Sequence, residues 1–161
     1  MRRVLAILAL ALLPGCWGYH TLSDTPGRIR SAALPPFQNR TLYTGLEFEL
    51  QEALVKELQA KSGIAVVGAG VADAVLEGRV MDFRRSVLKQ DADGHDIEFQ
   101  ITVTADFTLK EWRTGKVLSS RDAVSVSGSF LLTRGESEAT ARARAMSELA
   151  ERIVSVILYA W

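Results

Sequence analysis

Residues 97–111 alternate between apolar and polar side chains without a break. The apolar positions are Ile97, Phe99, Ile101, Val103, Ala105, Phe107 and Leu109, and the positions between them are Glu98, Gln100, Thr102, Thr104, Asp106, Thr108 and Lys110. Successive side chains of a strand point to opposite faces of a sheet, so this pattern predicts a strand with one face on a core and one in water. One-sided burial is typical of antiparallel sheets, so we expect strand neighbours on both sides.

Turn signals border this strand at both ends. The sequence Asp-Ala-Asp-Gly occupies residues 91–94, and Arg-Thr-Gly occupies residues 113–115. We therefore expect an antiparallel meander in which a strand over residues 74–88 comes first and one over residues 117–130 comes last. Gly78, and Asp82 beside Phe83, predict a bulge or a change of face in the first of these strands.

Two segments have the periodicity of amphipathic helices. In the first, the apolar positions are Leu46, Leu50, Ala53, Leu54 and Leu58. The sequence Thr-Gly-Leu-Glu at residues 44–47 fits a capping box before it, and Ser62-Gly63 ends it. The second helix is expected over residues 136–158, after another capping box at residues 133–136. Its apolar side consists of Ala139, Ala143, Met146, Ala150, Ile153, Val154, Ile157 and Leu158.

The remaining strands are short. Residues 29–34 form a first strand that Pro35-Pro36 stops, residues 37–41 form a loop, and residues 64–67 form a strand after the first helix. The predicted order is therefore β-α-β-β-β-β-α. This order favours an α/β (α+β) two-layer sandwich, in which two helices pack on one face of a mixed sheet of four to five strands.

The start of the chain is typical of a bacterial lipoprotein. Arg2 and Arg3 precede an uncharged apolar run over residues 4–13, which is too short to span a bilayer of about 30 Å. Leu-Pro-Gly-Cys at residues 13–16 resembles a lipobox, so we expect residues 1–15 to be a signal peptide and Cys16 to carry lipid. Residues 16–28 then form a tether. The only Cys of the chain stands at this point, and the alternatives are a free thiol or an intermolecular disulfide.

The charge balance argues against a nucleic-acid partner. Removal of residues 1–15 takes away two arginines and leaves 17 Lys and Arg against 19 Asp and Glu. The length and the 48% hydrophobic content fit one packed domain over residues 29–161.

Catalytic and metal-binding patterns are missing from the sequence. His20 and His95, the only histidines, lack metal-ligand spacing with each other and with Cys16. Asp91, Asp93 and Asp96 partly match the ligand spacing of a calcium-binding loop, but the position of Gly94 fits a hairpin turn better. We therefore expect no enzyme activity, no metal and no cofactor.

One group of basic residues is a candidate binding site. The meander places Arg84, Arg85, Lys89 and Arg134 at one tip, and the apolar residues near them are Leu88, Phe130, Leu131 and Leu132. Cations beside apolar groups suit an anionic amphiphile such as a phosphorylated glycolipid. The alternative is a solvated surface in which arginines pair with Asp91 or Asp93.

The order of several motifs resembles one family. Gly15-Cys16-Trp17-Gly18-Tyr19-His20-Thr21-Leu22 resembles the Gly-Cys-Gly-Tyr-x-Leu start of the lipopolysaccharide (LPS) assembly lipoproteins, the LptE-like family, with Trp17 inserted. Residues 33–41 are similar to its strand-Pro-Phe-x-Asn-x-Thr segment. Residues 45–47 at the first helix, residues 72–78 entering the next strand, the alternating hairpin and the C-terminal helix also fit, so the resemblance covers the mature chain.

This resemblance implies a fold, a partner and a location. LptE-like proteins have two helices on a mixed sheet and sit inside the barrel of the outer-membrane LPS translocon protein, LptD. There they plug the lumen, help the barrel to assemble and contact LPS. A polar strand face would suit a polar lumen, and equally bulk water. Trp17, where sorting signals for the inner membrane have Asp, points to the outer membrane, with the domain facing the periplasm or the barrel lumen.

A second family type shares the strand-Pro-Phe-Asn start and the amphipathic helix after it. These are the curli-secretion lipoproteins and the lipoprotein activators of peptidoglycan synthases. A pore-forming protein should carry a separate membrane-crossing segment, whereas the strands here are committed to one core. The enzyme-activator alternative stays open from sequence.

Overall fold

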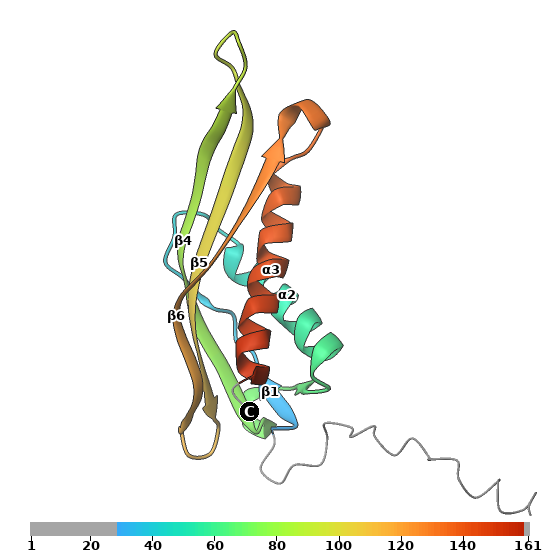
Figure 1. The fold of residues 1–161 in the computed structure, drawn as a ribbon. Helices are drawn as coiled ribbons and strands as arrows, with labels where there is room; N and C mark the ends of the chain where they lie inside the picture. The colour runs from blue at the N-terminus through green and yellow to red at the C-terminus, as the bar shows by residue number, and fades with distance from the viewer. Residues whose placement is uncertain (1–28, 160–161) are drawn as a thin grey trace, which may run out of the picture.

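Three long antiparallel strands form most of the sheet. The structure is a computed structural model that describes residues 29–159. In it β4 (Ala74–Gln90), β5 (Asp96–Glu111) and β6 (Val117–Leu131) pair in succession and run the length of the molecule (Figure 1). The predicted meander is therefore confirmed, and its central strand is the alternating segment.

Three short strands complete the sheet on the other side of β4. Strand β1 (Ser31–Ala33) pairs in parallel with both β3 (Ala65–Val66) and β4, which gives the order β3-β1-β4-β5-β6. The sequence predicts a loop over residues 37–41, but the structure has a two-residue strand there, β2 (Gln38–Asn39), parallel to β4. This segment hydrogen-bonds to backbone groups of β4 that β5 leaves free: the Arg40 N–H donates to the Val80 carbonyl over 2.9 Å.

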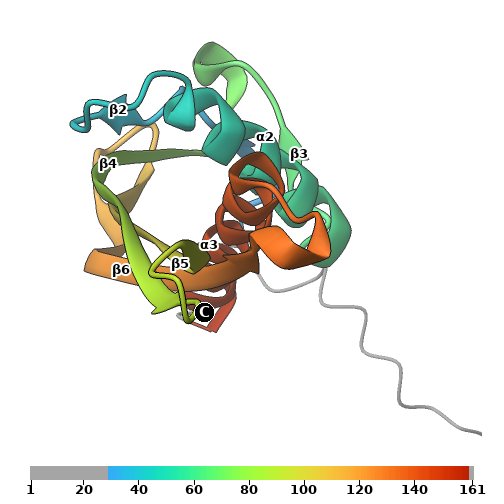
Figure 2. The same ribbon diagram turned by 90° about the horizontal axis from the view of Figure 1, so that it is seen from above.

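Two helices cover one face of the sheet, as predicted. Helix α2 (Leu46–Lys61) and helix α3 (Glu138–Tyr159) lie side by side, as seen from above in Figure 2. Ion pairs between Lys61 and Glu151 (2.7 Å) and between Arg142 and Glu49 (3.0 Å) connect them. The buried residues of the two helices are Leu46, Leu50, Leu54, Leu58, Ala141, Ala145, Met146, Leu149, Ala150, Ile153, Val154 and Ile157.

Both predicted capping boxes are wrong. Helix α2 begins after Gly45, whose φ of 91° suits glycine, and the Glu47 carboxylate instead accepts a hydrogen bond from the Asn39 side chain over 2.7 Å. Helix α3 begins two residues later than predicted, because the hydroxyl of Ser137 accepts from the Thr140 N–H. The Glu136 carboxylate turns back to the Leu131 N–H. Ala139 and Ala143 of the predicted apolar side are exposed, and Ala141, Ala145 and Leu149 are buried instead.

Bulges bend the meander near its middle. The register of β4 shifts between Val80 and Asp82, which confirms the predicted irregularity, and the register of β6 shifts opposite Asp106. The β6 irregularity contains Ala123, at a φ of 54°. Beyond the β4 bulge the β4–β5 hairpin extends past the helices (Figure 1), and residues 84–90 are all exposed.

Candidate functional site

The face of the sheet opposite the helices is a polar surface. The alternating polar residues of β5 point to this side, and three of them pair with hydroxyls of β6 across the strands. The hydroxyl oxygens lie 2.9 Å apart in Thr102–Ser127, 3.1 Å apart in Thr104–Ser125 and 3.1 Å apart in Thr108–Ser120. Such cross-strand pairs satisfy each other's hydrogen bonds without a covering layer. This uncovered face, which we call the outer face, is therefore stable in a polar environment.

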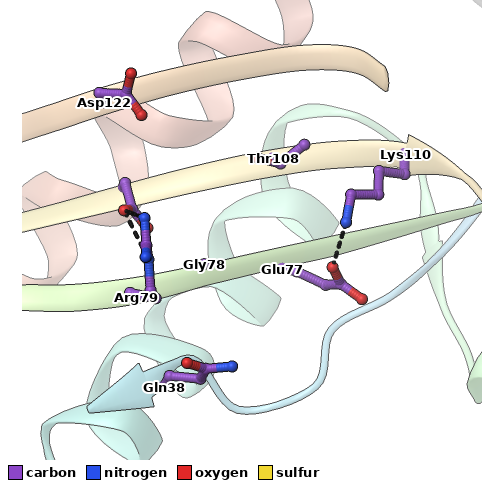
Figure 3. Close-up of a pocket in the computed structure, with 8 residues that line it drawn as sticks. Gln38, Glu77, Gly78, Arg79, Thr108, Lys110 and Asp122 are labelled. Carbon is purple, nitrogen blue, oxygen red and sulfur yellow. Dashed lines mark hydrogen bonds and ion pairs between the residues drawn. The ribbon is translucent and has the colours of Figure 1, made fainter. Parts of the chain in front are cut away.

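A hollow of about 220 Å³ lies on the outer face beside β2 (Figure 3). It is lined by Gln38, Glu77, Gly78, Arg79, Asp106, Thr108, Lys110 and Asp122. The Arg79 guanidinium binds the Asp106 carboxylate through Nε, at 3.2 Å to Oδ1 and 2.9 Å to Oδ2, and Nη2 makes a further contact. This bond to Asp106 raises the pKa of Arg79. Lys110 pairs with Glu77 at 2.8 Å.

Asp106 stands out in this hollow because it is only 8% exposed on an otherwise wet face. A buried carboxylate is costly without a partner, and the two-point contact with Arg79 supplies one. The charges of the hollow are thus largely matched within it. The sequence pattern did not single out this pair, because the two residues lie 27 positions apart and meet only through the strand register.

The four predicted basic residues lie near one end of the meander but not on one face. Arg84 and Arg85 are neighbours in β4 and so point to opposite sides. Arg84 pairs with Asp82 at 2.8 Å. Arg85 reaches the helix side, where it pairs with Glu138 of α3 at 2.8 Å and lies 5.3 Å from the centre of the Phe99 ring. Arginine pairing thus occurs, although not with Asp91 or Asp93.

Lys89 and Arg134 are the two exposed cations at the tip. Lys89 is opposite Glu98 of β5, and Glu98 is opposite Leu131 of β6, so the ends of the three strands are adjacent. Arg134 follows in the short helix η3 (Leu132–Arg134). Within residues 29–159 neither cation forms an ion pair.

The apolar surface at this tip differs from the predicted one. Phe130 is buried at 2% exposure and stacks on Phe99, with the ring centres 5.3 Å apart, so it is not accessible to a ligand. Leu88 and Leu132 are about half exposed. We call Leu88, Lys89, Leu132 and Arg134 the basic tip.

The hairpin turn at the end of β4 has the predicted glycine geometry. Gly94 has a φ of 85°, and Asp91 Oδ1 accepts from the N–H groups of Asp93 (3.0 Å) and His95 (2.8 Å). These backbone bonds, chiefly the one from His95, lower the pKa of Asp91. Carboxylate oxygens of Asp91 and Asp93 and an imidazole nitrogen of His95, which could bind a metal ion, lie within 4.8 Å of one another. All three residues are exposed, and the hydrogen bonds of the turn explain why they are close together.

The family model for lipopolysaccharide assembly, LptE, matches residues 29–157, which is most of the chain. The chain belongs to the LptE family. This is a family of membrane-associated lipoproteins without enzyme activity, so the chain is an LPS-assembly lipoprotein in kind. Comparison with curated proteins gives no match.

Several solved structures share the fold. A protein of Xanthomonas campestris is 14% identical over 85% of this chain and 90% of its own, with a TM-score of 0.58. An uncharacterised lipoprotein B from Nitrosomonas europaea is 12% identical over 84% and 94%, with a TM-score of 0.54. A minor lipoprotein from Acinetobacter baumannii is 18% identical over 78% and 90%, with a TM-score of 0.52. Identities this low show the fold alone.

The predicted signal peptide (1–15), the lipidation site Cys16 and the tether (16–28) lie outside the described residues. Among residues 29–159, none of the helices combines the length and the apolar character needed to cross a membrane.

Proposed function

We propose that this LptE-family protein is held in the outer membrane by lipid on Cys16, plugs the LPS-translocon β-barrel and helps that barrel to assemble. The observation that carries this proposal is the outer face of the sheet. It is polar along its length, it lacks a covering helix among the described residues, and its hydroxyls pair across the strands. A polar lumen is the environment that such a face fits, and family membership supplies the LPS-assembly role.

We further propose that the basic tip contacts LPS directly. Lys89 and Arg134 are exposed and unpaired within residues 29–159, so they can bind phosphate without breaking an ion pair. Leu88 and Leu132 beside them can contact acyl or sugar surface. Charge-assisted hydrogen bonds to phosphate are among the stronger contacts available to a protein, so two such cations would contribute measurably to binding.

The barrel role is tested by purification from detergent-solubilised outer membranes. The tagged full-length protein should co-purify with a large β-barrel protein in a defined ratio. Recovery of a peptidoglycan synthase in place of a barrel would contradict the proposal and favour the enzyme-activator alternative.

The LPS contact is tested with a double charge reversal. Lys89→Asp combined with Arg134→Asp should weaken LPS binding by about tenfold or more and leave the circular dichroism spectrum unchanged, because exposed unpaired charges contribute little to stability. Arg113→Asp combined with Lys116→Asp is the matched control, since both cations are exposed, form no ion pair within residues 29–159 and lie in the turn at the other end of the meander. A folded double variant that binds LPS as well as the wild type would refute the tip assignment and leave the barrel role intact.

A further inference from the structure

Strand β4 has one long edge without a partner strand in the described part of the chain. On the side away from β5, β4 pairs with β1 at Ala74 and Val75 and with β2 at Arg79 and Val80. From Asp82 to Gln90 no strand of residues 29–159 pairs with that side. An edge of this length offers a row of N–H and C=O groups to an incoming strand.

The pairing register shows which backbone groups point outward. The Val80 carbonyl accepts from Arg40, so Val80, opposite Ala105, directs its backbone away from β5. In an antiparallel ladder this orientation repeats at every second residue of β5. Val103, Ile101 and Phe99 follow at that spacing, and their partners in β4 are Phe83, Arg85 and Val87. The backbone groups of these three β4 residues therefore point to the open edge.

The free edge of β6 is interrupted near its middle. The Arg152 guanidinium of α3 donates to the outward carbonyl of Ser125 over 3.0 Å. The irregularity at Ala123, with its positive φ, interrupts β6 close by. Bulges and covering side chains are the usual means of preventing strand addition. Near its middle, the edge of β6 is therefore less accessible to an added strand than the edge of β4 from Phe83 to Val87.

The side chains along this edge indicate what kind of strand would fit. Residues 82–90 contain one carboxylate, Asp82, and three cations, Arg84, Arg85 and Lys89. Asp82 and Glu138 of α3 pair with the two arginines, so one net positive charge, that of Lys89, remains along this edge. Val87 and Leu88 are 44% and 50% exposed. A second copy pairing here in antiparallel fashion would bring like charges together, which is unfavourable. A strand with acidic and apolar side chains is the complementary partner.

We propose that the β4 edge from Phe83 to Val87 receives an extended segment with acidic side chains from the barrel partner. This assignment rests on the proposed barrel function and adds a second contact with the barrel to that of the outer face. The projecting β4–β5 hairpin gains most from such a contact, because strands that extend beyond a core are weakly stabilised by themselves.

Amide hydrogen exchange tests this contact at single residues, using the purified full-length protein alone and in complex with its barrel. Formation of the complex should slow exchange of the outward amides of Phe83, Arg85 and Val87 at least about tenfold. The amides of Arg84 and Ser86, which already bond to β5, serve as the internal reference. A complex in which the outward amides exchange as fast as in the free protein would overturn this contact and leave the barrel function standing. Full protection already present in the free protein would overturn it too, because the edge would then be covered by the chain itself. If no complex forms, both proposals fail.

A pair of substitutions separates loss of the backbone bond from loss of the side chain. Val87→Pro removes the outward N–H, and proline is tolerated on a strand edge when that N–H faces away from the sheet. Val87→Thr keeps the N–H and the branched shape. We expect Val87→Pro to weaken barrel affinity about tenfold and Val87→Thr by less than about twofold. Equal affinities for the two variants, with unfolding midpoints like that of the wild type, would overturn strand addition at this position.

Discussion

Gly78 and Gly128 are both strand glycines, yet the structure predicts opposite effects when a methyl group is added to each. A Cβ at Gly78 would lie 2.3 Å from Cε2 of Phe37 and 2.4 Å from the backbone oxygen of Asp106. A Cβ at Gly128, on β6, would meet no atom within 4 Å. The Phe37 ring therefore packs directly on the backbone of Gly78, whereas the space beside Gly128 is empty.

The magnitudes follow from these distances. Ordinary contacts begin near 3.4 Å, so Gly78→Ala must displace both a buried ring and a strand backbone by about 1 Å. Overpacking of this kind typically costs about 1–3 kcal/mol. Gly128→Ala reduces the freedom of the unfolded chain at an unstrained position and should be neutral or stabilise by about 0.4–1 kcal/mol. The free energies of unfolding of the two variants should therefore differ by about 1–4 kcal/mol.

Urea unfolding of the purified domain, followed by circular dichroism, measures this difference. Equal slopes with denaturant would show that both variants expose the same surface, so the midpoints can be compared directly. Equal midpoints for Gly78→Ala and Gly128→Ala would refute the close approach of Phe37 to β4. Because β2 follows Phe37 directly, Gly78→Ala should also disturb the hollow around Arg79 and Asp106.

Two further outcomes test the core and the acid response. Phe107 is 1% exposed, so Phe107→Ala should lower the free energy of unfolding by about 3–5 kcal/mol. Thr108→Ala, on the outer face, should lower it by about 1 kcal/mol through loss of the bond to Ser120. Similar unfolding midpoints for the two variants would mean that the faces of β5 are assigned wrongly. The Asp73 carboxylate accepts hydrogen bonds from the Arg30 N–H and from Ser31, and these bonds lower its pKa. The ionised carboxylate therefore stabilises the fold at pH values above the unfolded-state pKa, near 3.8. This contribution is lost as the pH falls through the folded-state pKa. Relative to Asp73→Asn, the advantage of the wild type should therefore be constant from pH 7 to about pH 5 and shrink below about pH 4, and an advantage that persists in acid would contradict this role.

Long periodic patterns were sufficient to predict the main elements from sequence. The unbroken alternation of β5 fixed both its extent and its faces, and Leu46, Leu50, Leu54 and Leu58 are all buried as their spacing predicted. Asp82 correctly indicated a bulge in β4, whereas the register is regular at Gly78, where the missing side chain makes room for Phe37. These signals are strong because many apolar side chains of one segment must lie on the same face to be buried in the core.

Features that depend on single contacts could not be predicted in the same way. Strand β2 has two residues, too few for any period, and exists because β4 offers it an edge. Glu47 and Glu136 fit capping boxes locally but bind Asn39 and the Leu131 backbone, which only the folded chain brings near. Arg84 and Arg85 were predicted to share one site, although strand alternation alone places the two on opposite faces. The burial of Asp106 could not be predicted, because it depends on a register with Arg79.

Site-specific photo-crosslinking in cells tests most directly whether the outer face meets the barrel. A benzoylphenylalanine probe replaces Thr104, at the middle of the outer face, or Ser147, exposed on α3, in the otherwise complete chain. Docking of the outer face against the lumen wall predicts a strong ultraviolet-dependent adduct between the Thr104 variant and the translocon barrel, and a much weaker one from the Ser147 variant. An adduct from Ser147 alone, or none from either variant when both are present at wild-type levels, would contradict the proposed role of this face.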